Sequence, residues 1–242
     1  MPIPCDKCPL RHCDYFLPFT EEELAFMRRF KAGELSVSAG TTVLMEGQNS
    51  TQVFTVLSGM GTRYKTLEDG QRQVINFLFP GDFIGLQAGI MGEMKHSVEA
   101  SSPMVLCVFN RSDLWSMFKA HPARAYDLTW IAAVEEHFLG ETLAAVGQRS
   151  AGQRVAWALL RIHRRLRSVG MEKAGAVPIA FRQQDLADAL GLSLVHTNKT
   201  LMHLRQQGMA RWTDGSLEIR DRTSLATYAG SAPEPLEKRP LM

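Results

Sequence analysis

The first thirteen residues, MPIPCDKCPLRHC, hold three of the chain's four cysteines: Cys5, Cys8 and Cys13. Thiolates bind transition metals and take part in disulfide exchange. The N-terminus has no apolar stretch typical of a secretory signal, so we expect a reducing, cytoplasmic location. Cysteines clustered in such a compartment are typically metal ligands or redox groups rather than structural disulfides.

The sequence around the cysteines leaves several kinds of chemistry open. Zinc is one, held by the three N-terminal cysteines together with His12 or Cys107. A redox dithiol in the CDKC segment is another, and the cysteines having no function is a third. The neighbouring cations Lys7, Arg11 and His12 predict that the thiolate forms are favoured.

Length and charge divide the chain into two unlike parts. Its 242 residues are 45% hydrophobic, enough for one large domain or two modest ones. Residues 1–149 hold 13 Lys and Arg against 17 Asp and Glu, a net charge of −4, whereas residues 150–242 hold 14 against 8, a net of +6. A basic C-terminal part predicts a phosphate-bearing partner. No apolar run is long enough to predict a membrane span.

The residue patterns predict an α+β fold. Short runs rich in Val, Thr, Phe and Ile, separated by Gly and Asp, fill residues 34–109 and predict an antiparallel β-roll, a cupin-like pair of sheets. We expect five parts in order: a cysteine-bearing segment (1–20), a sensory β-roll (21–122), a dimerisation helix (123–149), a winged helix-turn-helix domain (150–230) and a disordered tail (231–242).

The long helix carries apolar residues at near-helical spacing. Such a stripe indicates either a helix that crosses its own domain or one that pairs with a second copy of the chain. We predict the second, with a seam made of Leu128, Ile131, Phe138, Leu139, Leu143 and Val146.

The stretch FRQQDLADALGLSLVHTNKTLMHLRQQGMARW predicts two helices joined by a tight turn. Gln183–Leu190 forms the first helix, Gly191 the turn, and Ser193 the N-cap of a second helix that Gly208 ends. Two helices in this arrangement form a helix-turn-helix unit. The Asp214-Gly215 pair that follows predicts a β-hairpin wing.

The second helix of such a unit enters the major groove of double-stranded DNA with its N-terminal residues at the base edges. Asn can pair with adenine, Lys can donate to guanine, and Val can contact the thymine methyl group. A winged helix that binds protein instead of DNA is the alternative. The candidate DNA-binding residues are Ser193, Val195, His196, Thr197, Asn198, Lys199 and Arg205, of which Thr197 and Arg205, like Arg182 before the unit, are expected at phosphates.

These motifs together resemble the cyclic-AMP receptor/fumarate-nitrate-reduction (Crp/Fnr) family of bacterial transcription regulators. The resemblance covers about residues 10–228 and is carried by GDFIG at Gly81–Gly85, the long helix, and LADALGLSLVHTNKTLMHLRQQGM in the winged helix. It implies a homodimer that binds palindromic DNA and contacts RNA polymerase. No nucleophile–base constellation is present, so we do not expect an enzyme.

The chain departs from the cyclic-AMP-binding members of that family. Those members have a Glu directly after GDFIG and an Arg-Ser pair further on, where this chain has Leu86 and His96-Ser97. An imidazole cannot reproduce the bidentate binding of phosphate by a guanidinium group. We therefore do not expect cyclic AMP to bind. The oxygen-sensing branch has Glu, Ser and Arg at the positions of Val195, Asn198 and Lys199, so a different DNA half-site is expected.

The resemblance is nearer to the oxygen-sensing branch, whose members hold a [4Fe–4S] cluster. It implies that Cys5, Cys8, Cys13 and Cys107 are the four ligands here, that oxygen destroys the cluster, and that the dimer then loosens. A second hypothesis is that the roll binds an effector other than cyclic AMP while the cysteines hold zinc, are redox-active or have no role. Haem is one such effector, with His96, His121 or His137 as ligand.

Overall fold

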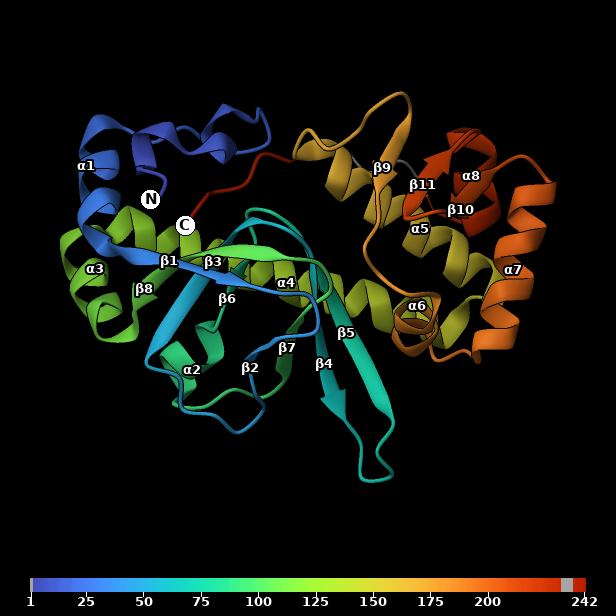
Figure 1. Ribbon diagram of the computed structural model, residues 1–242, viewed down its shortest axis with the longest axis horizontal. Coiled ribbons are helices and arrows are strands. Elements are labelled where there is room, and N and C mark those ends of the chain that lie inside the picture. The colour runs from blue at the N-terminus through green and yellow to red at the C-terminus, as the bar shows by residue number, and fades with distance from the viewer. Residues whose placement is uncertain (1, 232–236) are drawn as a thin grey trace. The chain divides into compact units, whose positions relative to one another are not determined.

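The computed structural model describes residues 2–231 and 237–242 (Figure 1). Its helices are α1 (Glu21–Phe30), α2 (Leu86–Met91), α3 (Leu114–Ala120), α4 (Pro122–Gln148), α5 (Ala151–Ser168), α6 (Gln183–Leu190), α7 (Leu194–Gln206) and α8 (Arg222–Ala229), with short 3-10 turns η1 (Cys5–Lys7), η2 (Pro9–His12) and η3 (Arg111–Asp113). Its strands are β1 (Lys31–Val37), β2 (Thr42–Leu44), β3 (Gln52–Ser58), β4 (Gly61–Thr66), β5 (Arg72–Leu78), β6 (Phe83–Ile84), β7 (Ser97–Ala100), β8 (Met104–Asn110), β9 (Ala176–Pro178), β10 (Ala210–Thr213) and β11 (Ser216–Ile219).

The chain divides into two compact units. The first unit comprises residues 1–65, 78–136 and 237–242, and the second comprises residues 66–77 and 137–236. Among the described residues, no helix is long and apolar enough to cross a membrane.

The predicted β-roll is confirmed. Two four-stranded sheets form it, in the orders β1-β8-β3-β6 and β2-β7-β4-β5, and the pairings within them are antiparallel. Strand residues alternate between the two faces of a sheet, so each sheet turns one apolar face inward. Leu44, Phe54, Val56, Val98 and Leu106 form the centre of the resulting core.

A second cluster of buried residues joins the helices of the first unit to the outside of the roll. Met27 of α1, Phe109 of β8 and Met117 of α3 belong to it. Helix α1 begins at a capping box in which the Thr20 hydroxyl accepts from the Glu23 amide and the Glu23 carboxylate accepts from the Thr20 amide. The capping box fixes where α1 begins, and the Cys5 thiol contacts that helix at the Met27 carbonyl oxygen.

Helix α4 has the predicted length, but part of its predicted seam lies inside the chain. Leu128 and Ile131 are buried in the second cluster, so they cannot contact a partner. Phe138 stacks on Trp157 of α5 with ring centroids 6.5 Å apart, and Val146 is half-buried. The apolar pattern of the sequence could not distinguish residues that face the chain's own core from residues that face a second copy.

The second unit holds the winged helix-turn-helix, which is confirmed. Its core includes the stripe Val155, Leu159, Ile162 and Leu166 along α5. The sheet β10-β11-β9 forms the wing, and Asp214 and Gly215 both have positive φ, as a two-residue hairpin turn requires.

The prediction of a disordered tail is wrong for its last four residues. Residues 239–242 are buried in the first unit, and Arg239 forms an ion pair with Asp82. The composition suggested disorder because it is rich in Pro and charge, but the partner of Arg239 lies far away in the sequence. Residues 232–236 of the predicted tail lie outside the described residues.

Candidate nucleic-acid interface and cysteine site

The local geometry of the helix-turn-helix follows from its turn residues. Gly191 ends α6 in the left-handed conformation, with φ of 63°, which costs glycine little. The Ser193 hydroxyl then accepts a hydrogen bond from the His196 amide and caps α7. Ser193 is therefore the N-cap of α7, as predicted, and its hydroxyl positions the start of that helix.

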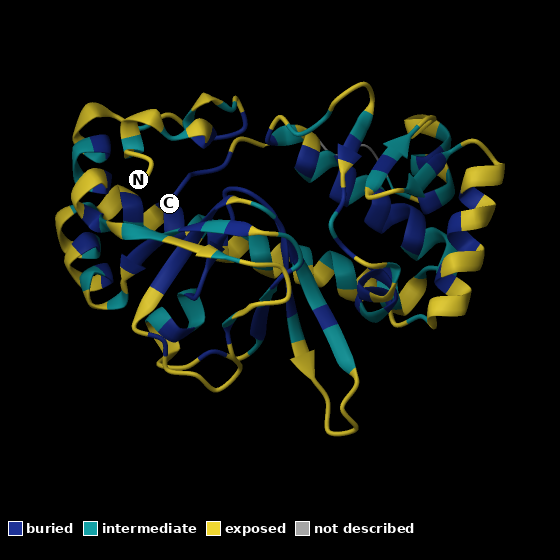
Figure 2. Ribbon diagram, viewed as in Figure 1, coloured by how far each residue is buried: buried dark blue, intermediate teal, exposed yellow. Residues whose placement is uncertain are grey.

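The first turns of α7 present an exposed face (Figure 2). Val195 is 79% exposed, and His196, Asn198 and Lys199 are exposed beside it. Arg205 is exposed near the other end of the helix. Short polar and cationic side chains at a helix N-terminus are the groups that read base edges in a major groove.

Met202 and His203 of α7 are among the exposed residues that were not predicted from the sequence. Met202 is 56% exposed, and His203 is exposed with its ring 6.2 Å from that of Tyr228. Their spacing from Val195 and Lys199 along the helix could have indicated them, since residues three and four apart share a helix face.

Thr197 corrects the predicted set of DNA contacts. Its side chain is fully buried, so it cannot reach a phosphate. Its hydroxyl oxygen has no hydrogen-bond partner among the described residues. A helical residue between two exposed neighbours can face inward. Because threonine is polar, the sequence alone suggested that Thr197 is exposed and can contact a phosphate.

Replacing Thr197 by valine tests this correction. Because the hydroxyl is buried without a partner, we expect Thr197→Val to keep or raise the midpoint of thermal unfolding. We also expect DNA affinity to stay within about twofold, since no phosphate contact is lost. A fall in DNA affinity of tenfold or more with unchanged thermal stability would show that Thr197 contacts DNA after all.

A cavity of about 510 Å³ lies at the start of α7. Ser193, Val195, His196 and Lys199 line it together with Tyr228 of α8. Four of the predicted residues, Ser193, Val195, His196 and Lys199, therefore border one concave surface of the second unit.

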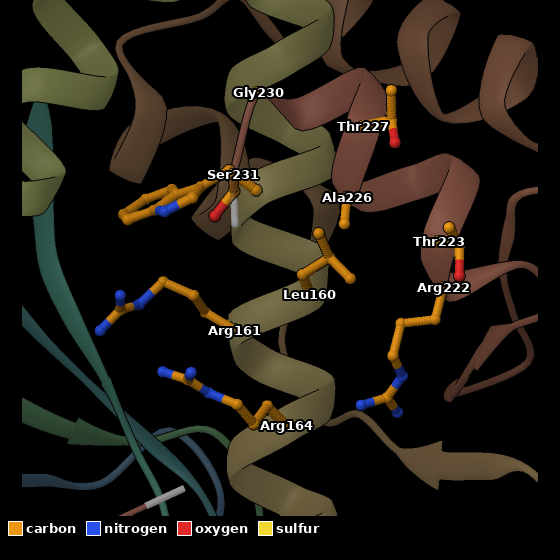
Figure 3. A pocket seen from close by; sticks show the side chains of 10 residues that line it. Leu160, Arg161, Arg164, Arg222, Thr223, Ala226, Thr227, Gly230 and Ser231 are labelled. Atoms are coloured by element: carbon orange, nitrogen blue, oxygen red, sulfur yellow. The ribbon is translucent and has the colours of Figure 1, made fainter. Parts of the chain in front are cut away.

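A separate cavity of about 480 Å³ lies between α5 and α8. Figure 3 shows Arg161 and Arg164 projecting into it from α5 and Arg222 from α8. The Arg161 guanidinium also lies over the Trp157 ring, 5.2 Å from its centroid. This cavity gathers part of the positive charge of the C-terminal part of the chain, away from the exposed face of α7.

The N-terminal segment brings three of the four cysteines to one cavity. Cys5, Cys8 and Cys107 line a space of about 30 Å³ in the first unit. The Cys5 thiol donates to the Met27 carbonyl oxygen at 3.6 Å. Cys13 does not line this cavity, and its thiol lies 3.8 Å from the Pro9 carbonyl oxygen.

Three of the four cysteines have raised pKa values. Burial raises the pKa of Cys5 and of Cys13, and it raises the pKa of Cys107 to about 12. Lys31 opposes the shift at Cys5 and Cys107, but burial outweighs it. The prediction that neighbouring cations favour the thiolates is therefore wrong, because Lys7, Arg11 and His12 are not among the groups that shift these pKa values.

The four thiols are the kind of ligand that an iron–sulfur cluster requires, but the space between three of them is small. Four thiols are the usual ligands of such a cluster. Within the described residues, no three His, Cys, Asp or Glu side chains are grouped closely enough to hold a metal ion. The space between Cys5, Cys8 and Cys107 has room for about one water molecule. A metal group would require the N-terminal segment to open.

The roll positions that depart from the cyclic-AMP-binding pattern lie in the first unit. Burial, with help from Arg63 and Lys65, lowers the pKa of His96 to about 4, so its imidazole is neutral at pH 7. The Ser97 hydroxyl accepts from the Glu46 amide at 3.0 Å. The other two histidines named as haem candidates lie elsewhere. The His121 ring packs against the Phe26 ring, with ring centroids 4.0 Å apart. His137 is exposed in the second unit.

Sequence comparison finds two known domain families in the chain. The profile of the cyclic nucleotide-binding domain matches residues 34–121. The profile of the Crp-like helix-turn-helix domain matches residues 153–228. The first match covers most of the β-roll and the second covers α6, α7 and the wing.

Individual relatives cover most of the chain. The nitrogen fixation regulation protein FixK of Azorhizobium caulinodans is 31% identical over 181 residues, 74% of this chain and 72% of that protein. The transcriptional activator protein FnrL of Cereibacter sphaeroides is 28% identical over 85% of this chain and 83% of that protein. The solved structure of FixK2 from Bradyrhizobium japonicum superposes with a TM-score of 0.75 and 27% identity over 84% of this chain and 98% of that one.

The chain belongs to the Crp/Fnr family of transcription regulators, and FixK and FnrL are among its similar members. It is a regulator with a DNA-binding helix-turn-helix. Because its relatives are transcription regulators, the prediction that it is not an enzyme is confirmed.

Proposed function

We propose that this regulator binds a palindromic DNA site as a homodimer and reads each half-site with α7. The exposed Val195, His196, Asn198 and Lys199 at the capped start of that helix carry the proposal. Asn198 and Lys199 discriminate between bases, and Arg205 binds phosphate. Selection of binding sites from random DNA by the full chain tests this reading.

The second copy binds along α4. Leu139 and Leu143 are 46% and 75% exposed, and Ala132, Gly140 and Gly147 are exposed on the same helix. Small residues around exposed leucines allow two helices to approach closely. The dimer seam therefore contains fewer of the predicted residues than the six that the sequence suggested. RNA polymerase is the protein partner that the family membership supports.

The signal acts through the cysteines as an oxygen-labile [4Fe–4S] cluster held by Cys5, Cys8, Cys13 and Cys107. The convergence of three of these thiols on one cavity supports this, because Cys107 of β8 is far from Cys5 and Cys8 in the sequence. The cluster, when bound, supplies redox chemistry, while the N-terminal segment and β8 supply the ligands and exclude water from them.

Iron analysis tests the cluster directly. Protein purified without oxygen should contain about four iron atoms and four acid-labile sulfides per chain. Exposure to air should remove both and weaken DNA binding. Zinc in place of iron, or no metal at all, would contradict the cluster while leaving the DNA-binding function intact.

A second candidate for the signal is an effector in the roll, with the cysteines zinc-bound, redox-active or without a role. The raised pKa values of Cys5, Cys13 and Cys107 favour protonated thiols in the metal-free chain, which supports the case in which the cysteines have no role. In that case the iron analysis gives no iron and the signal enters through the β-roll.

Cyclic AMP is not that effector. His96 is neutral at pH 7 because its pKa is about 4, and it therefore offers no charge to a phosphate. We expect cyclic AMP at about 1 mM, a concentration that would detect even weak binding, to give no saturable heat of binding in calorimetry at pH 7. We also expect it to leave the affinity for DNA unchanged. Saturable binding in the micromolar range would show that other groups of the roll hold the phosphate.

A further inference from the structure

Residues 239–242 are buried in the first unit against the N-terminal segment and the roll. Around Phe16, the backbone of the tail pairs with the N-terminal segment as a short parallel bridge. The Arg239 amide donates to the Tyr15 carbonyl oxygen at 3.0 Å, and the Leu17 amide donates to the Arg239 carbonyl oxygen at 2.9 Å. Backbone pairing of an extended segment with an open edge is a common way for proteins to bind peptides.

A buried ion pair fixes the register of the tail. The Arg239 guanidinium donates to the Asp82 carboxylate at 2.9 Å, and the two side chains are 4% and 5% exposed. The other Asp82 oxygen accepts from the Phe79 amide at 2.8 Å. A buried charge is tolerated when it is paired, so removing Arg239 leaves the carboxylate without its cation.

The same turn of the roll contacts the N-terminal segment. A Cβ atom at Gly81 would lie 2.2 Å from the Phe16 ring, so the ring rests directly on the backbone beside Asp82. Phe16 and Arg239 are the two residues of the parallel bridge. Side chain and backbone thus bring the roll, the N-terminal segment and the tail together at one place.

The last two residues line the cysteine cavity. Leu241 and Met242 are 4% and 3% exposed and line the cavity together with Cys5, Cys8 and Cys107. The Thr55 hydroxyl donates to the terminal oxygen of Met242. Thr55 lies directly opposite Cys107 in the pairing of β3 with β8.

We propose that residues 239–242 are an intramolecular ligand, and that the surface formed by the N-terminal segment and the Gly81-Asp82 turn of the roll is a binding site for a peptide of the form Arg-Pro-apolar-apolar. With the tail bound, the space left among the three thiols holds about one water molecule. Cys5, Cys8 and Cys107 are partly exposed, and Leu241 and Met242 cover the side of the cavity that the tail lines, so these two residues slow the approach of a larger reagent to the three thiols. The tail therefore controls access to the cysteines, whatever those cysteines bind.

Alkylation of the individual cysteines tests the proposal. The full chain, freed of metal by a chelator and kept reduced, is treated with N-ethylmaleimide, and the rate at each cysteine is followed by mass spectrometry. Two variants remove the tail's contacts: a chain ending at Leu236, and Arg239→Gln. Lys238→Ala is the matched control because Lys238 is an exposed tail residue.

We expect the chain ending at Leu236 to react at least tenfold faster at Cys5, Cys8 and Cys107, and Arg239→Gln to show a smaller rise at the same three. Cys13 should keep its rate in every variant because it does not line the cavity. Adding the peptide EKRPLM to the shortened chain should restore protection.

Equal rates in the full and shortened chains would overturn the proposal. An equal rise at Cys13 would also overturn it, because the effect would then be a general loosening of the N-terminal segment. If the shortened chain does not fold, Arg239→Gln decides, and unchanged rates in that variant reject the tail as a cover. Neither result depends on DNA binding or on iron.

Discussion

Leu143→Glu should convert the regulator into a monomer and lower its affinity for a palindromic site at least a hundredfold. Leu143 is 75% exposed on α4, so a carboxylate there costs the fold of one chain little. Two carboxylates facing each other across a helix seam repel and lose the apolar contact. A monomer then has only one half-site to hold and loses the gain of roughly 10² or more that linked binding gives.

Sedimentation velocity measures the first effect and a gel shift with a palindromic fragment measures the second. Met91→Glu is the matched control, since Met91 is an exposed apolar residue on α2. It should leave both the dimer and DNA binding unchanged. An unchanged sedimentation coefficient for Leu143→Glu would place the dimer seam elsewhere.

Asn198→Ala and Lys199→Ala should each weaken binding to the specific site by about 1–3 kcal/mol. This corresponds to roughly a fivefold to hundredfold rise in Kd. Both residues are exposed in the first turns of α7, where a recognition helix meets base edges. Each variant should also relax the preference for one base pair, which a panel of single-base changes in the site reveals.

Gln207→Ala is the control for this pair, because Gln207 is exposed at the far end of α7. It should bind with nearly the affinity of the unchanged chain. If Asn198→Ala and Lys199→Ala lower affinity for random DNA as much as for the specific site, the two side chains contact phosphate and do not read bases.

The helix-turn-helix could be predicted to the residue because its signals are local. Gly191, Ser193 and the Asp214-Gly215 turn each act within a few residues of their own position. Helix ends and tight turns depend on nearby backbone geometry, so the sequence around them suffices. The roll and the long helix could be predicted from repeated apolar patterns in the same way.

The features that were missed depend on contacts between distant residues. Leu128 is buried in its own unit, and only the packing of α1, β8 and α3 around it shows this. The tail is ordered because Arg239 meets Asp82, which lies 157 residues earlier. The pKa of Cys107 is set by burial, which the sequence near it does not reveal. Apolar periodicity and composition do not predict which distant residues contact one another.

Selection from a random DNA library by the full chain tests the central claim most directly. We expect enrichment of a palindrome whose half-sites are about one helical turn apart, because each copy of α7 would enter one major groove. Affinity for that site should fall steeply between about 50 and 200 mM salt. A library that stays random after repeated rounds, with weak binding that does not respond to salt, would contradict the assignment of α7 as a DNA-reading helix.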